Sequence, residues 1–171
     1  SKGSYEAEKV SETISPSMDI QIASNFERLI FDLNNGDDQQ TSLDMKNIKE
    51  KGQYLINDDK LNKISENFLS ARMSEDETLE VIKKVYEKYS VVLDPHTAIG
   101  YGAFDKHNLK GNNIVLATAH PCKFPDAVSK AINLKSDLPK ELEFILNEKE
   151  DYDIIDNNLE KIKNYIIGKT K

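Results

Sequence analysis

The first part of the chain places its apolar residues at helical spacing. Between about 18 and 34 they recur every three or four positions, which puts them on one face of an amphipathic helix. The residues on this face are Ile22, Phe26, Leu29, Ile30 and Leu33. Polar and charged residues fill the positions between them. We therefore predict a helix that buries this face and ends in the polar stretch after residue 34.

Local start and stop signals predict three further helices before residue 90. Thr41 or Ser42 is placed to cap the first of them, and Gly52 to end it. Ser74 is followed three residues later by Glu77, the spacing of a capping box, in which each side chain bonds the other residue's backbone N–H. This stretch of the chain is therefore expected to be mainly helical.

The hydrophobic pattern changes after residue 90. Residues 91–93 and 114–117 are short continuous apolar runs, typical of buried strands, and each is followed by a helical segment. We predict an α/β fold with few parallel strands and a large helical block: mainly helical over 15–90, strand–helix–strand–helix over 91–134, and helices over 135–171. Because two strands cannot complete a doubly wound sheet, other strands are either hidden in weaker segments or lie on another chain segment.

Composition and charge narrow the class of protein. The 171 residues carry a net charge of −7, opposite in sign to most nucleic-acid-binding modules. The longest apolar runs are about five residues, far below the roughly 20 that cross a bilayer. Cys122 is the one cysteine, which excludes a disulfide framework and fits a reducing compartment. We expect a cytoplasmic protein that binds neither nucleic acid nor membrane.

Most side chains that could take part in catalysis or ligand binding lie in the two loops that follow the predicted strands. Asp94 and His96 come after the first strand, and Thr118 and His120 after the second. In α/β proteins, small-molecule sites form beyond the carboxyl ends of strands. A threonine hydroxyl there can donate one hydrogen bond and accept two, although capping of the local loop is its commoner role. These four residues are therefore the candidate site.

Two lysines, Lys106 and Lys123, are expected near the same rim. An ammonium group there is a suitable point charge for a phosphate group, although solvated surface lysines are commoner. The seven glycines are dispersed and form neither of the glycine-rich motifs that hold a nucleotide phosphate. The sequence therefore shows no phosphate-binding backbone loop.

Cys122 leaves two alternative chemistries open. With His96, His120 and Asp94 it makes a possible zinc ligand set, but His-x-Cys is not the spacing of a standard structural zinc site, and we expect no metal. The Cys122 thiol next to His120 is also a possible nucleophile. An isolated cysteine is more often a small buried hydrophobic residue. An unrelated metal- or thiol-dependent enzyme is therefore one alternative hypothesis.

Five short segments, taken in order, resemble threonine synthase of the longer bacterial and fungal type, in the C-terminal portion of that enzyme. They are residues 14–20, 24–29, 94–98, 118–124 and 136–142. The most specific is the Thr-Ala-His-Pro-Cys-Lys-Phe string that begins at Thr118, where Cys122 stands in place of the family's usual alanine. The resemblance covers nearly the whole chain.

Membership of this family implies a pyridoxal-phosphate-dependent enzyme of fold type II, which is similar to the tryptophan synthase β subunit. Such an enzyme converts O-phospho-L-homoserine and water to L-threonine and phosphate. The family holds the cofactor through a lysine that follows a phenylalanine, and the cofactor phosphate in a glycine-rich loop. This sequence has neither. We therefore expect a fragment with no Schiff-base lysine and no catalytic residue, inactive without its partner, the N-terminal part of the same enzyme.

The resemblance also implies roles for individual residues. The Thr118 hydroxyl would contact the pyridine nitrogen of pyridoxal phosphate, and Asp94 would lie near the edge of the ring. His96, His120 and Lys123 would support these residues or bind the substrate phosphate. A neutral hydroxyl does not hold the ring nitrogen protonated, as a carboxylate would, so electron withdrawal by the ring is milder.

A different class of function is also open. A stand-alone binding or interaction domain derived from the same fold would keep a helical surface for partners and lose the chemistry. Degraded residues at the rim would favour that hypothesis, but Asp94, His96, Thr118 and His120 all match the family pattern. An exposed sheet edge on such a fragment also predicts self-association.

Overall fold

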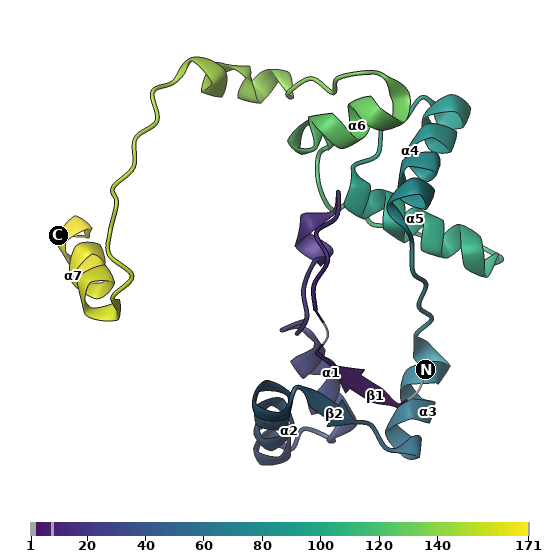
Figure 1. Ribbon diagram of the computed structural model, residues 1–171, viewed down its shortest axis with the longest axis vertical. Helices are drawn as coiled ribbons and strands as arrows, with labels where there is room; N and C mark the ends of the chain where they lie inside the picture. Colours follow the sequence, from purple (N-terminus) through teal and green to yellow (C-terminus); the bar gives the residue numbers. More distant parts are fainter. Residues whose placement is uncertain (1–2, 8, 171) are drawn as a thin grey trace. The chain divides into compact units, whose positions relative to one another are not determined.

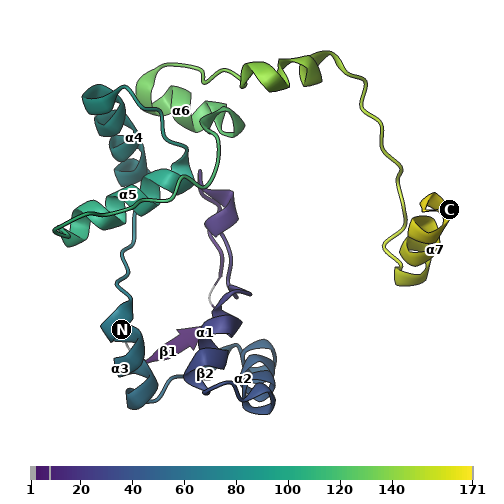
Figure 2. The ribbon, with the colours of Figure 1, turned by 180° about the vertical axis from the view of Figure 1, so that it is seen from behind.

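The computed structural model describes residues 3–7 and 9–170 of the chain (Figure 1). It divides into two units, residues 1–136 and residues 137–171. The first unit contains, in chain order, β1 (Ser4–Glu6), the 3-10 turn η1 (Pro16–Met18), α1 (Phe26–Leu33), α2 (Asp38–Lys51), β2 (Gln53–Leu55), α3 (Asp58–Asn67), α4 (Glu75–Tyr89), α5 (Pro95–His107), η2 (Pro121–Lys123) and α6 (Pro125–Ile132). The second contains η3 (Lys140–Asn147) and α7 (Leu159–Lys169). The described chain is therefore rich in helices and contains one small sheet (Figure 2).

The small sheet contributes to an apolar cluster that it shares with α1 and α2. β1 and β2 pair as antiparallel strands, with Tyr5 opposite Tyr54. Tyr54 is buried together with Ile30, Met45 and Ile48 in one cluster. Because these residues come from α1, α2 and β2, burial of this apolar surface holds the two helices to the sheet.

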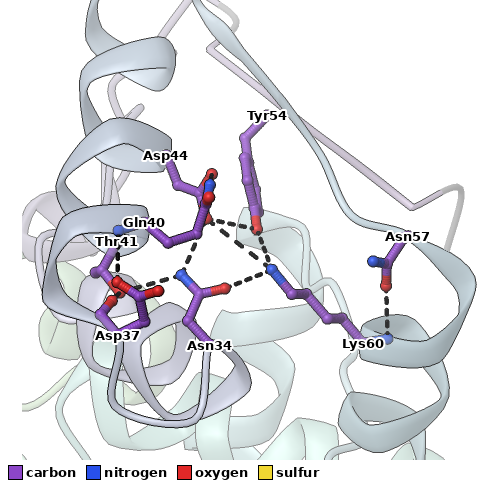
Figure 3. A network of polar contacts seen from close by, with 8 residues as sticks. All are labelled: Asn34, Asp37, Gln40, Thr41, Asp44, Tyr54, Asn57 and Lys60. Carbon is purple, nitrogen blue, oxygen red and sulfur yellow. Dashed lines mark hydrogen bonds and ion pairs between the residues drawn. The ribbon is translucent and has the colours of Figure 1, made fainter.

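A polar network centred on Asp44 adjoins this cluster (Figure 3). Asp44 is buried, and its carboxylate accepts hydrogen bonds from the Gln40 amide at 2.8 Å, the Asn34 amide at 3.0 Å and the Tyr54 hydroxyl at 3.2 Å. The Lys60 ammonium donates to Asn34 and lies 4.0 Å from the carboxylate. Burial, reinforced by the Asp44 carboxylate, raises the pKa of Tyr54 to about 12. The network thus joins the end of α1, α2, β2 and α3.

Further along the chain, α4 packs against α5 and α6 (Figure 1). Ile82 and Val85 of α4 are buried at helical spacing. Ala98 of α5 and Val128 of α6 are fully buried. This packing fixes the start of α5, which is where the candidate residues lie.

Several local sequence signals are confirmed. The Ser74 hydroxyl accepts from the Glu77 N–H at 3.2 Å, and the Glu77 carboxylate accepts from the Ser74 N–H at 2.7 Å, as in a capping box. Gly52 ends α2 with a φ of 68°, a left-handed conformation that glycine adopts without steric penalty. Each of these signals depends on a few neighbouring residues, so tertiary packing does not override it.

Two helices begin at residues other than those predicted. The Asp37 side chain caps α2, so Thr41 lies within the first turn instead of preceding it. The first predicted helix is shorter, because an irregular stretch follows η1 and α1 starts only at Phe26. In this stretch the Asp19 carboxylate accepts hydrogen bonds from the backbone and the hydroxyl of Thr13, both at 2.7 Å. Such local side-chain bonds compete with helix formation.

The two predicted parallel strands are not formed in the described structure. Residues 91–93 and 114–117 are irregular and pair with no strand among the described residues, whose one sheet is antiparallel. Ile114 is 89% exposed and Leu116 is 74% exposed. A strand exists only through hydrogen bonds to a neighbouring strand, and no such neighbour adjoins these segments here. The region 91–134 thus consists of α5, η2 and α6 joined by irregular segments.

The described part of the second unit contains the 3-10 helix η3 and the α-helix α7. Asn158 caps α7 by accepting a hydrogen bond from the Lys161 N–H at 3.1 Å. Apolar side chains on both helices, including Phe144 and Ile166, are more than half exposed. Among the helices that the structure describes, none is long and apolar enough to cross a membrane.

Candidate functional site

Asp94 begins α5 as its N-cap. It is 1% exposed, and its Oδ1 accepts hydrogen bonds from the backbone N–H groups of His96 at 2.9 Å and Thr97 at 3.4 Å. These are two of the N–H groups that a helix leaves unpaired at its start, and Pro95 has none to satisfy. The Asp-Pro-His-Thr sequence is therefore a strong local helix start, and the helix dipole favours a carboxylate there.

The Asp94 carboxylate also binds two side-chain donors. The Thr97 hydroxyl donates to Oδ2, and Nδ1 of His96 lies 3.0 Å from Oδ1. Both carboxylate oxygens are thus engaged by groups of the same helix turn. Since the residue is also buried, Asp94 orients its neighbours and does not face solvent.

His96 connects α5 to a distant turn. Its Nε2 accepts a hydrogen bond from the backbone N–H of Ser17 in η1 at 3.2 Å. A ring nitrogen that accepts carries no proton, so this bond assigns the imidazole proton to Nδ1, which donates to Asp94. The ring also lies against Phe124, with 4.7 Å between the ring centroids. His96 is therefore a buried residue whose two ring nitrogens both take part in hydrogen bonds.

Thr118 joins this arrangement through Thr97. The Thr118 N–H donates to the Thr97 hydroxyl oxygen at 3.0 Å, and the two hydroxyl oxygens lie 3.5 Å apart. Thr118 is exposed, whereas Thr97 is 4% exposed. The structure thus brings Asp94, His96 and Thr118 together in one hydrogen-bonded set.

Sequence reasoning missed Thr97 as a functional residue. The prediction included it in the 94–98 segment without giving it a role. The available signal was a hydroxyl residue three positions after an aspartate that caps a helix, because such a side chain can reach the cap from the first turn. Its contact with Thr118, 21 residues away, is not visible in any local pattern.

His120, Cys122 and Lys123 form a separate small turn. The Nδ1 of His120 accepts a hydrogen bond from the Cys122 N–H at 3.2 Å, which caps η2. The contact involves the Cys122 backbone and not its thiol. His120 and Lys123 are exposed. Within the described residues, His, Cys, Asp and Glu side chains form no group of three that could hold a metal ion.

Lys106 lies away from the candidate site, contrary to the prediction. It stands near the C-terminal end of α5, about 16 Å from the helix start at 1.5 Å per residue. Its ammonium group donates to Glu77 and to the carbonyl oxygen of Arg72, each at 2.7 Å. Lys106 therefore links α5 to the start of α4, because the helix direction carries it away from Asp94.

The arrangement can be compared with known proteins. The chain superimposes on the crystal structure of the PLP-bound threonine synthase from Brucella melitensis with a TM-score of 0.82 and 39% identity, over 96% of this chain and 36% of that one. For the yeast threonine synthase structure the TM-score is 0.80 and the identity 36%, over 99% of this chain and 38% of that one. The fold is thus that of one part of a larger enzyme.

The sequence matches lead to the same family. Residues 97–166 match the family model described as threonine synthase, C-terminal. The chain is 34% identical to the Pseudomonas aeruginosa threonine synthase over 95% of its own length, and 38% identical to the Saccharomyces cerevisiae enzyme over 96%. The chain thus corresponds to the C-terminal part of these threonine synthases. It spans 35% and 37% of the lengths of these two relatives.

Proposed function

We propose that this chain supplies the C-terminal part of a pyridoxal-phosphate-dependent threonine synthase. The complete enzyme converts O-phospho-L-homoserine and water to L-threonine and phosphate. The observation that carries the proposal is the hydrogen-bonded set around the start of α5. Three motif residues from two separate segments meet there: Asp94 contacts His96 directly and Thr118 through Thr97. A domain that had lost its chemistry would have no need to keep this set together.

The Thr118 hydroxyl is a suitable hydrogen-bond partner for the ring nitrogen of the cofactor. It is exposed and has one polar contact within the described residues, the Thr97 oxygen at 3.5 Å. Because the Thr97 proton is directed at Asp94, Thr118 is the only possible donor in this long contact, and its hydroxyl proton can turn from it toward a better-placed incoming acceptor. A pyridine nitrogen is such an acceptor. Bound pyridoxal phosphate supplies an electron sink, and a hydroxyl partner keeps its ring nitrogen unprotonated.

Asp94 acts indirectly in this proposal. The resemblance implied that it lies near the edge of the cofactor ring. Its carboxylate is buried and engaged by donors of its own helix turn, so its role here is to orient Thr97 and His96. His96 in turn holds the Ser17 backbone beside the start of α5.

Lys123 is the candidate for the substrate phosphate. It is exposed, and its ammonium group makes no ion pair or hydrogen bond among the described residues. It lies in η2, which follows Thr118 closely in the chain. An ammonium group at this place would bind a phosphate as a point charge. His120 would support it by keeping the turn capped.

The remaining part of the same enzyme is the proposed partner. No lysine in the chain follows a phenylalanine, so the lysine that binds the cofactor in this family would lie in that part. The exposed apolar side chains of Ile114 and Leu116 support such a partner, because a buried strand segment needs a neighbouring strand. The chain alone is then inactive, and self-association through this segment would compete with correct assembly. We place the enzyme in the cytoplasm.

The test is a chimera of the full-length Saccharomyces cerevisiae threonine synthase in which this chain replaces the matching C-terminal segment. We expect phosphate release from O-phospho-L-homoserine by the chimera and none by the chain alone. An intact, folded chimera that binds pyridoxal phosphate but has no activity would favour a non-catalytic binding domain instead.

A labelling experiment on the chain alone tests where the cofactor lysine lies. Pyridoxal phosphate is added, the mixture is reduced with borohydride, and modified lysines are located by mass spectrometry. We expect no specific adduct. A single stoichiometric adduct at one lysine would place the Schiff-base residue in this chain and would contradict the proposal.

A further inference from the structure

Thr97 has a role that the resemblance does not assign. We propose that Thr97 is a positioning residue that fixes the backbone of Thr118 by accepting its amide proton, and so sets the direction of the Thr118 hydroxyl. The bond itself is independent of the proposed function. What the oriented hydroxyl does rests on that function.

The donors and acceptors around Thr97 leave one arrangement. Its hydroxyl has a single proton, which it donates to Oδ2 of Asp94. Its lone pairs are then available to donors only, and the Thr118 N–H approaches one of them at 3.0 Å. Any rotation of the hydroxyl group would break the bond to the buried carboxylate. Asp94 therefore determines which way the Thr97 oxygen presents its lone pairs to Thr118.

Thr118 depends on this bond because its segment lacks other backbone support. Between residues 114 and 119, the Thr118 amide makes the one backbone hydrogen bond found in the described structure. The preceding residues 114–117 are irregular and mostly exposed. Thr97, by contrast, is buried on a helix and has the restricted side-chain rotamers of a β-branched residue. A rigid residue thus anchors a segment that has no strand partner here.

The decisive experiment measures amide hydrogen exchange at Thr118 by NMR in the isotope-labelled chain. In Thr97→Val the side-chain shape is kept and the acceptor is lost, so we expect exchange at Thr118 to accelerate about tenfold. Thr97→Ser keeps the hydroxyl and should restore most of the protection. The matched control is Thr78→Val, which removes another buried threonine hydroxyl, one that donates to the Ser74 carbonyl at 2.8 Å. It should leave Thr118 exchange unchanged.

The outcomes separate the positioning role from general loss of structure. Equal exchange at Thr118 in the wild-type chain and in a folded Thr97→Val variant would overturn the proposal. Thr97→Val could instead unfold α5, which lost protection throughout that helix would show. In that case the rate of amide exchange at Thr118 in the wild-type chain tests the proposal. A Thr118 amide that exchanges there at the rate of an unstructured peptide would also overturn the proposal.

A second measurement shows whether the oriented hydroxyl matters to the cofactor. In the chimeric holoenzyme, Thr97→Val should shift the visible absorption of bound pyridoxal phosphate and lower kcat with little change in KM, and Thr97→Ser should restore both. If the amide protection changes as expected but the absorption does not, the positioning of Thr118 stands and the proposed contact of Thr118 with the cofactor fails.

Discussion

The backbone N–H of Ser17 donates a hydrogen bond to Nε2 of His96, which lies 79 residues further along the chain. The bond joins η1 to the start of α5. It also leaves the opposite ring nitrogen, Nδ1, to donate to Asp94. One imidazole therefore fixes two segments that no local sequence signal connects, and the candidate site depends on it for its shape.

Replacing His96 by phenylalanine tests this dual role. His96→Phe keeps an aromatic ring against Phe124 but removes both nitrogens, leaving the Ser17 N–H without its acceptor and Asp94 with one donor fewer. We expect a loss of about 2–4 kcal/mol in the free energy of unfolding, measured by urea denaturation. His120→Phe is the matched control. Because His120 is exposed, this substitution should lower the free energy of unfolding much less. Equal losses for the two variants would contradict a special role for His96.

The Asp44 network makes a second prediction about stability. Asp44→Ala removes the acceptor of Asn34 and Tyr54 and the counter-charge of Lys60; Asp44 and Tyr54 are buried, and Asn34 and Lys60 are partly buried. Since unpaired buried polar groups are costly, we expect a loss of about 3 kcal/mol in the free energy of unfolding. As a control, Glu50→Ala breaks an exposed ion pair and should have little effect. A similarly small effect of Asp44→Ala would show that solvent reaches the network.

The raised pKa of Tyr54 predicts that the free energy of unfolding falls at alkaline pH. The folded chain raises its pKa from 10.0 to about 12, chiefly by burial and then by the Asp44 carboxylate. The folded state thus holds the phenol proton more tightly than the unfolded state. Its contribution is complete below pH 10 and is lost as the pH rises from 10 to 12. The measurement compares the unfolding free energy of the wild type and Tyr54→Phe over this interval, and a difference that does not change with pH would refute the prediction.

Thr118 makes a prediction about activity in the full-length chimera. Thr118→Val removes the proposed hydrogen bond to the cofactor ring nitrogen, which is worth roughly 1–3 kcal/mol. We therefore expect kcat/KM to fall by roughly 5- to 150-fold, together with a change in the visible spectrum of the bound cofactor. Thr118→Ser keeps the hydroxyl and should retain most of the activity. Unchanged turnover and an unchanged spectrum in Thr118→Val would refute the assignment.

Local signals in the sequence were enough for much of the helical structure. The Ser74–Glu77 capping box and the helix end at Gly52 both formed as predicted. Each involves bonds within a single turn, so a few residues determine it. The five segments that resemble threonine synthase were also recognisable without the structure, because a motif and its order along the chain are properties of the sequence alone.

Contacts between distant segments were decided only by the tertiary structure. The apolar runs at 91–93 and 114–117 were predicted as strands, but a strand needs a neighbouring backbone, and none adjoins them in the described structure. Lys106 was predicted at the site, but the direction of α5 carries it to the other end of the helix. The bond from Thr118 to Thr97 depends on where α5 ends up after packing on α4. The sequence by itself determined the helices, the family and the types of residue at the site, because these follow from short-range physics, whereas the packing of distant segments determined which of those residues meet.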